Sequence, residues 1–162
     1  MTPEGRIAEG AKSISYLRTL FYETQGRFSP ETHPHWVAYA SDESGRYEVY
    51  IDTFPERRRK TPISAGGGMY PAWGASGREL YYVSPDFKLM VVGVKFGTDF
   101  VEASAPRELF RLPGVEDGYS PFEPAPDGER FLVRATPQQQ AAAPLTVIVN
   151  WPARMRKQSL AP

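Results

Sequence analysis

Short apolar runs bounded by turn residues recur along the whole chain. The runs are rich in valine, isoleucine, tyrosine or phenylalanine and are flanked by glycine, proline, aspartate or serine, which is the pattern of β-strands joined by tight turns. No window keeps apolar residues at the helical spacing i, i+3, i+4, i+7 for three turns. The pattern predicts strands at 16–22, 36–41, 47–53, 61–64, 79–84, 89–95, 107–111, 129–135 and 145–151.

Three of these runs begin units that resemble one another. "WVAYAS" starts at Trp36, "ELYYVS" at Glu79 and "RFLVRA" at Arg130, so successive copies are 43 and 51 residues apart. Periods of this length are typical of β-propellers, in which each blade is a sheet of four short strands. Both faces of the first two runs are apolar or aromatic, as expected for a sheet that has neighbours on both sides.

The sequence therefore predicts an all-β fold, a partial β-propeller of about three four-stranded antiparallel blades. We place the blades within residues 16–155, with repeats near 28–70, 71–114 and 122–151, after a disordered or linker segment at 1–15 and before a frayed tail at 156–162. Closed propellers have about 4–8 blades, so three leave apolar faces and strand edges open. We expect a fragment of a larger propeller, or a ring completed by a protein partner or by self-association.

Composition limits the chemistry. The chain has 162 residues, enough for one domain with a core, and no cysteine, which excludes disulfides, thiol catalysis and cysteine-ligated metals. Nineteen basic residues balance nineteen acidic ones, so no overall charge recruits nucleic acid. No apolar run approaches the length of a membrane span, and we expect no membrane insertion by this chain. A complete chain would be cytoplasmic, whereas the C-terminal part of a membrane-anchored sensor would be extracytoplasmic (periplasmic).

Several segments, in order, resemble the TolB-type, WD-repeat-like β-propellers: "GRFSP" (26–30), "WVAYASDESGRYEVYI" (36–51), "ISAGGGMYPAWGASGRELYYVSPDFKLMVVGV" (63–94), "LF" (109–110), "PDGERFLV" (126–133) and "LTVIVNW" (145–151). They are most similar to the propeller that follows the kinase domain and membrane helix in many bacterial serine/threonine kinases. The resemblance implies a non-catalytic binding or sensor module for protein–protein interaction. One departure is "SPETHPHW", which replaces the family's Ser-Pro-Asp-Gly turn, is two residues longer and lacks the glycine.

Motifs for catalysis are missing. The kinase glycine-rich loop, catalytic loop and Asp-Phe-Gly triplet are absent, as are a Walker loop and the Gly-x-Ser-x-Gly elbow of serine hydrolases. We expect no enzyme activity and no cofactor. The alternative is a propeller segment of a prolyl-oligopeptidase-like hydrolase that lacks its catalytic domain, because related propellers precede such domains.

Other unusual stretches have simpler interpretations. "AGGGMY" (65–70) could present backbone amides to an anion, but a strand and not a helix follows it, so we interpret it as a connector. "RRRK" (57–60) has acidic neighbours and is interpreted as a solvated loop. His33 and His35 could approach one metal ion, but only Glu31 is near as a third ligand, and an exposed turn is favoured.

If function lies in loops, two turns are the candidates for partner contact, since strands mainly fix the positions of the loops. We expect them to lie at one mouth of the propeller. The candidate residues are Thr32, His33 and His35 in the first turn, and Pro85, Asp86, Phe87 and Lys88 in the second.

Overall fold

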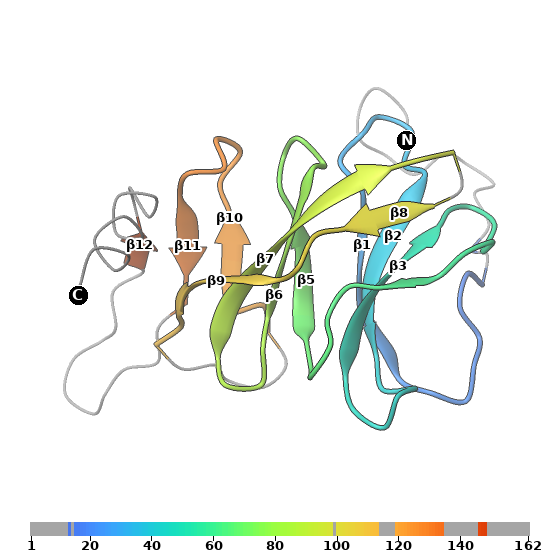
Figure 1. The fold of residues 1–162 in the computed structure, drawn as a ribbon, viewed down its shortest axis with the longest axis horizontal. Helices are drawn as coiled ribbons and strands as arrows, with labels where there is room; N and C mark the ends of the chain where they lie inside the picture. Colours follow the sequence, from blue (N-terminus) through green and yellow to red (C-terminus); the bar gives the residue numbers. More distant parts are fainter. Residues whose placement is uncertain (1–12, 14, 99, 114–118, 135–145, 149–162) are drawn as a thin grey trace.

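The fold is built from antiparallel β-sheets. A computed structural model describes residues 13, 15–98, 100–113, 119–134 and 146–148. Among these residues the chain forms strands and no helix, and the strands make three antiparallel sheets that lie in a row (Figure 1). The predicted all-β class with antiparallel sheets is confirmed. The expectations for residues 1–12 and for the tail at 156–162 lie outside the described residues.

The three sheets follow one another along the chain. The first has the order β1 (Glu23–Phe28), β2 (Trp36–Ser41), β3 (Glu48–Thr53), β4 (Thr61–Pro62). The second has the order β5 (Met69–Trp73), β6 (Glu79–Val83), β7 (Lys88–Phe96), and the outer edge of β7 pairs with both β8 (Val101–Ala103) and β9 (Arg107–Arg111). The third contains β10 (Phe122–Pro124), β11 (Phe131–Val133) and β12 (Thr146–Ile148). The three similar runs of the sequence thus form β2, β6 and β11, the second strand of each sheet.

The strand predictions are accurate for the apolar hairpins and fail at the first strands. β2 and β9 have the predicted bounds, and β3, β4, β6, β7, β11 and β12 overlap their predicted segments. The strand predicted at 16–22 is wrong, because the first strand begins only at Glu23; of this segment, Tyr16 and Leu17 pack on a face of the first sheet and residues 18–22 are exposed. β5, β8 and β10 were not predicted, because each is short and contains proline or charged residues.

The first strands of the first two sheets share a backbone irregularity. In β1 the pairing with β2 shifts at a bulge that contains Gln25, which has a φ of 58°. In β5 the pairing with β6 shifts at a bulge that contains Tyr70, which has a φ of 57°. Positive φ is uncommon for residues other than glycine. The bulges oppose Tyr39 and Tyr82, which occupy the same position in the two similar runs. The repeat therefore extends to local backbone geometry.

The sheets pack face to face, and the second is buried on both sides. Leu80 and Tyr82 of β6 pack against the first sheet, in a core that includes Trp36 and Ile51. Tyr81 and its alternate neighbours face the third sheet, in a core with Phe122, Phe131 and Val133. This alternation explains why the run has no polar face.

The first strands of the first two sheets also lie side by side. The backbone N–H of Tyr70 donates to Gln25 Oε1 at 2.6 Å, and the indole N–H of Trp73 donates to the Arg27 carbonyl at 3.1 Å. These bonds join β5 to β1 directly. The first two sheets are therefore held together at their first strands as well as through their shared apolar core.

Candidate binding pocket between the first two sheets

A pocket of about 320 Å³ opens between the first and second sheets. It lies at the end of the sheets where the β2–β3 and β6–β7 turns are found (Figure 1). Its walls come from the β2–β3 turn (Arg46, Tyr47), the connection between the sheets (Gly67, Gly68), the start of β5 (Met69, Tyr70), the end of β6 (Val83) and the β6–β7 turn (Ser84, Pro85, Phe87).

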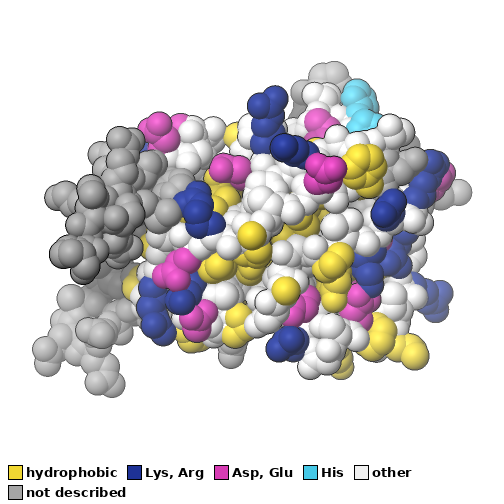
Figure 2. Space-filling view, in the orientation of Figure 1, with side chains coloured by type: hydrophobic (Ala, Val, Ile, Leu, Met, Phe, Trp, Pro, Cys, Tyr) yellow, Lys and Arg dark blue, Asp and Glu magenta, His cyan; other side chains and the backbone are white. Residues whose placement is uncertain are grey.

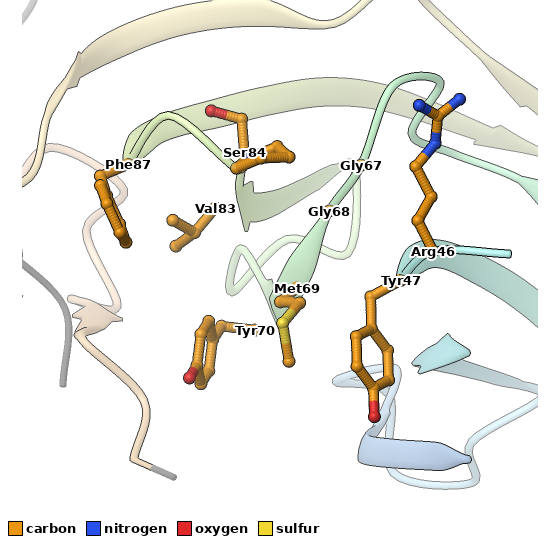
Figure 3. Close-up of a pocket in the computed structure, with 10 residues that line it drawn as sticks. Arg46, Tyr47, Gly67, Gly68, Met69, Tyr70, Val83, Ser84 and Phe87 are labelled. Atoms are coloured by element: carbon orange, nitrogen blue, oxygen red, sulfur yellow. The ribbon is translucent and has the colours of Figure 1, made fainter. Parts of the chain in front are cut away.

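The interior of the pocket is mainly apolar and aromatic. Figure 3 shows Phe87 and Tyr70 on one side and Tyr47 on the other, with Met69 between them, while the guanidinium of Arg46 points away from the interior. Aromatic rings and a thioether contact apolar groups of varied shape, so this surface suits an apolar side chain or a flat ring.

The wall made by the glycine loop is fixed by a buried carboxylate. Glu48 is 5% exposed, and its Oε1 accepts the backbone N–H groups of Gly66 at 2.9 Å and Gly67 at 2.8 Å. The same oxygen accepts Arg46 Nε at 3.0 Å, and Oε2 accepts the hydroxyl of Ser64. The loop does present amides to an anion, but the anion is the protein's own side chain. These amides are therefore occupied and leave no site for an external phosphate.

The pKa of Glu48 reflects these partners. Burial alone would raise the pKa of this carboxyl group, but the hydrogen bonds from Ser64, Gly66, Gly67 and Arg46 outweigh burial and hold the pKa below its usual value. The carboxylate is thus ionised at neutral pH, and its charge strengthens each hydrogen bond to the loop.

Glycine is required at position 67. Its φ is 106°, and a Cβ placed there would lie 2.3 Å from Cγ of Pro85, which is far inside van der Waals contact. The glycine loop and the β6–β7 turn therefore touch directly at the rim of the pocket. A side chain at position 67 would force these two segments apart.

The β6–β7 turn holds an aromatic ring at the rim. Phe87 has a φ of 60°, donates its N–H to the Ser84 carbonyl at 3.0 Å and is 43% exposed. Its carbonyl accepts the N–H of Leu112 at 2.8 Å, which ties the turn to the end of β9. A bulky residue in the left-handed region is strained, and such positions occur at ligand sites more often than elsewhere.

Charged neighbours also hold this turn. Lys88 Nζ lies 3.1 Å from Asp86 and 2.9 Å from Glu108. The hydrogen bond from Ser84, followed by that from Lys88, lowers the pKa of Asp86. Of the four residues predicted in this turn, Pro85 and Phe87 line the pocket, while Asp86 and Lys88 brace the turn.

The other predicted loop lies at the opposite end of the sheets. Thr32, His33 and His35 lie in the exposed β1–β2 connection, and Gly77 of the β5–β6 turn approaches Pro30 at that end. Figure 2 places the histidine side chains at the top of the view, away from the β6–β7 turn at the bottom of Figure 1. The structure therefore does not bring the two predicted loops together at one mouth.

The histidine loop is organised by Glu31. This carboxylate accepts the hydroxyl of Ser29 at 2.7 Å and the backbone N–H of His35 at 2.9 Å. The imidazole of His35 is 3.8 Å from it and is 74% exposed. Among the described residues no group of three or more His, Cys, Asp or Glu side chains could hold a metal ion.

The basic run at 57–60 lies on the surface with acidic partners. Its ion pairs join Arg57 to Asp52, Arg58 to Glu56 and Lys60 to Glu43. Figure 2 shows basic and acidic side chains interspersed over the visible face, without a large patch of one sign. The described surface in this view therefore offers no field that would favour a nucleic-acid backbone.

Sequence reasoning missed most of the pocket. Tyr47 comes from the β2–β3 turn of the first sheet, and Met69 and Tyr70 come from β5 of the second, so only the packing of two sheets brings them together. The one signal in the sequence is the triple glycine at 66–68. We interpreted it as a connector between sheets, and in the structure this connector also forms a wall of the pocket.

Comparisons with protein-family models and with curated proteins find no match to this chain. No helix within the described part of the chain has the length and apolar character needed to cross a membrane.

Proposed function

We propose that the chain is a non-catalytic binding module made of three β-propeller blades, and that it binds a partner protein through the pocket between the first two. Support for the blades comes from the three sheets that follow one another, the matching bulges in β1 and β5, and the hydrogen bonds between these first strands. The TolB-like motifs support the same interpretation and suggest a relative of kinase-associated sensor propellers.

The observation that carries the proposed site is the construction of the pocket. Loops from two blades supply its walls, one wall is fixed by the buried carboxylate of Glu48, and the ring of Phe87 is held at the rim in a strained backbone conformation. A fixed, apolar concave surface suits one apolar side chain of a partner, since binding then needs little reorganisation.

The test is a titration of isotope-labelled protein with N-acetyl-phenylalaninamide, followed by amide chemical shifts. We expect shifts centred on Gly67, Gly68 and Met69. Phe87→Ala removes one aromatic wall and should weaken binding about fivefold, which corresponds to about 1 kcal/mol for one aromatic contact.

The matched control is Phe100→Ala, because Phe100 is also 43% exposed but does not line the pocket. This variant should bind the probe as the unmodified protein does. Shifts that map to another surface, or equal effects of the two substitutions, would reject the pocket as the binding site. N-acetyl-glutamamide serves as a polar probe and should cause no comparable shifts.

A further inference from the structure

The first sheet has an outer face, turned away from the second sheet, that is covered in an unusual way. Val37, Tyr39 and Tyr50 are at most 6% exposed and form a separate apolar cluster. The partly buried side chains packed against this cluster are Tyr16, Leu17 and Phe54. Between neighbouring sheets, such an apolar face is covered by another whole sheet. On the outer face of the first sheet, two residues of a short segment, Tyr16 and Leu17, pack on it instead.

The contact made by this segment is limited. The hydroxyl of Tyr16 donates to the Thr53 carbonyl at 2.5 Å, and the Tyr16 ring lies 5.6 Å from that of Phe54. Residues 18–22 are exposed, with Leu20 at 99%. We call Tyr16 and Leu17 the cap.

Beside the cap, part of the outer face stays open. A pocket of about 210 Å³ lies among Tyr16, Phe28, Val37 and Phe54. Phe28 is 56% exposed and meets the Phe54 ring edge-on, with the ring centroids 4.8 Å apart. The cap thus leaves an apolar hollow that a larger, flat surface could fill.

The charged pair on this face is already neutralised. Asp52 is 1% exposed, and its Oδ2 accepts Nε of Arg57 at 2.8 Å. The first sheet itself would therefore bring no unpaired buried charge into the contact, whose desolvation would oppose docking.

The third sheet lies at the other end of the row (Figure 1). Phe131 and Val133 of β11 are 0% exposed and face the second sheet. Leu132 lies between them, so its side chain is on the opposite face, where it is 39% exposed. This outward face carries Leu132 and its cross-strand partner Glu123.

We propose that the outer face of the first sheet docks the outward face of the third sheet of a second copy, and that the cap must leave before docking. The inference rests on the proposed function, because it treats the sheets as blades. A two-fold arrangement makes this contact twice and brings six sheets into one ring, within the range of about 4–8 for closed propellers. A second copy is the chosen occupant because each chain supplies both the open face and the sheet that would cover it.

The cap then controls association quantitatively. Both copies must open, so the dimer association constant varies with the square of the fraction of chains whose cap is open. Tyr16→Phe deletes one hydrogen bond, and we expect the open fraction to rise about fivefold, the equivalent of about 1 kcal/mol. The dimer association constant should therefore rise about 25-fold.

Sedimentation velocity of the whole chain over a concentration series tests the inference. We expect Tyr16→Phe to strengthen dimerisation as calculated, while Leu20→Ala, in the same segment but fully exposed, leaves it unchanged. Adding Leu132→Arg to Tyr16→Phe should abolish the dimer, whereas adding Phe100→Arg should not. An unchanged association constant in folded Tyr16→Phe, or species larger than two copies, would overturn the proposal.

A second measurement does not depend on weakening the cap. The chain has no cysteine, so Phe28→Cys together with Leu132→Cys introduces the only thiols. Oxidation should link position 28 of one copy to position 132 of the other, because the contact joins unlike faces. Links between two copies of position 132, or no links, would contradict the arrangement. If the expected cross-link is missing but N-acetyl-phenylalaninamide still binds at the Phe87 pocket, the ring of two copies is rejected and the proposed function stands. If the probe does not bind at that pocket, the proposed function is rejected.

Discussion

Glu48 offers the most specific test of how the pocket wall is stabilised. Its carboxylate accepts hydrogen bonds from Ser64, Gly66, Gly67 and Arg46. Hydrogen bonds to a charged group contribute about 1.5–3 kcal/mol and neutral ones about 0.5–1.5 kcal/mol, so neutralising the acceptor costs about 1 kcal/mol per bond. Glu48→Gln keeps the shape and one carbonyl oxygen for the loop amides. The three bonds to the retained oxygen, from Gly66, Gly67 and Arg46, should each weaken by about 1 kcal/mol, so we expect Glu48→Gln to lower the free energy of unfolding by about 3 kcal/mol. This is equivalent to roughly 6–12 °C in melting temperature.

The pH dependence gives this prediction a sign. The fold lowers the pKa of Glu48 below the ordinary value of 4.5, so its contribution is present above that pH and is lost as the pH falls through the folded-state pKa. The stability difference between Glu48→Gln and the unmodified protein should therefore be full at pH 7 and shrink in solutions more acidic than the ordinary pKa.

Urea unfolding followed by tryptophan fluorescence measures both quantities. Glu102→Gln is the matched control, because Glu102 is an exposed strand residue. It should change the free energy of unfolding by less than about 0.5 kcal/mol. Equal stabilities of Glu48→Gln and the unmodified protein at pH 7, or a difference that persists undiminished in strong acid, would refute the assigned role of the carboxylate.

Two further predictions concern the core. Phe131 is 0% exposed and packs edge-on against the Tyr81 ring, with the ring centroids 5.1 Å apart. Phe131→Ala should therefore lower the free energy of unfolding, measured in urea, by about 3–5 kcal/mol. A decrease as small as that of Leu132→Ala would show that the third sheet does not pack on the second. Burial, followed by the charge of Glu48, raises the pKa of Tyr82 to about 12, so the stability linked to its neutral phenol is lost as the pH rises above 10. Ultraviolet titration should show fewer tyrosinates in the native protein than in urea at pH 11; equal numbers would contradict this burial.

The sequence predicted the hairpins well because they carry their own signal. β2, β6 and the central residues of β3 and β7 are largely buried, so they form mostly apolar runs whatever the neighbouring elements are. β1 and β5, by contrast, contain polar residues, glycine or proline, and are strands because a neighbouring strand and an adjacent sheet hold them. Such tertiary support is not visible in a local pattern.

The candidate site was predicted only in part for a similar reason. Pro85 and Phe87 line the pocket, but the prediction placed them beside the histidine loop at one mouth. The histidine loop follows the first strand of its sheet, whereas the β6–β7 turn follows the second strand. Antiparallel strands alternate in direction, so these two kinds of loop must lie at opposite ends. The interaction of Glu48 with Gly67, 19 residues away, depends on the path of the chain between the sheets and had no sequence signal.

The central claim is that the three sheets are copies of one unit stacked in the same orientation. Dipolar spectroscopy between nitroxides in this cysteine-free chain tests it directly. Adjacent sheets lie about 10 Å apart and a five-residue strand spans about 17 Å, so backbone separations of about 10 Å and 20 Å distinguish turns at the same end from turns at opposite ends. One doubly labelled variant carries Ala75→Cys and Glu129→Cys, in the β5–β6 and β10–β11 turns, and a second carries Asp86→Cys, in the β6–β7 turn, with Glu129→Cys. The account predicts that the two labels of the first variant are about 10 Å closer together than those of the second. The reverse order would mean that the third sheet is inverted and would contradict the account.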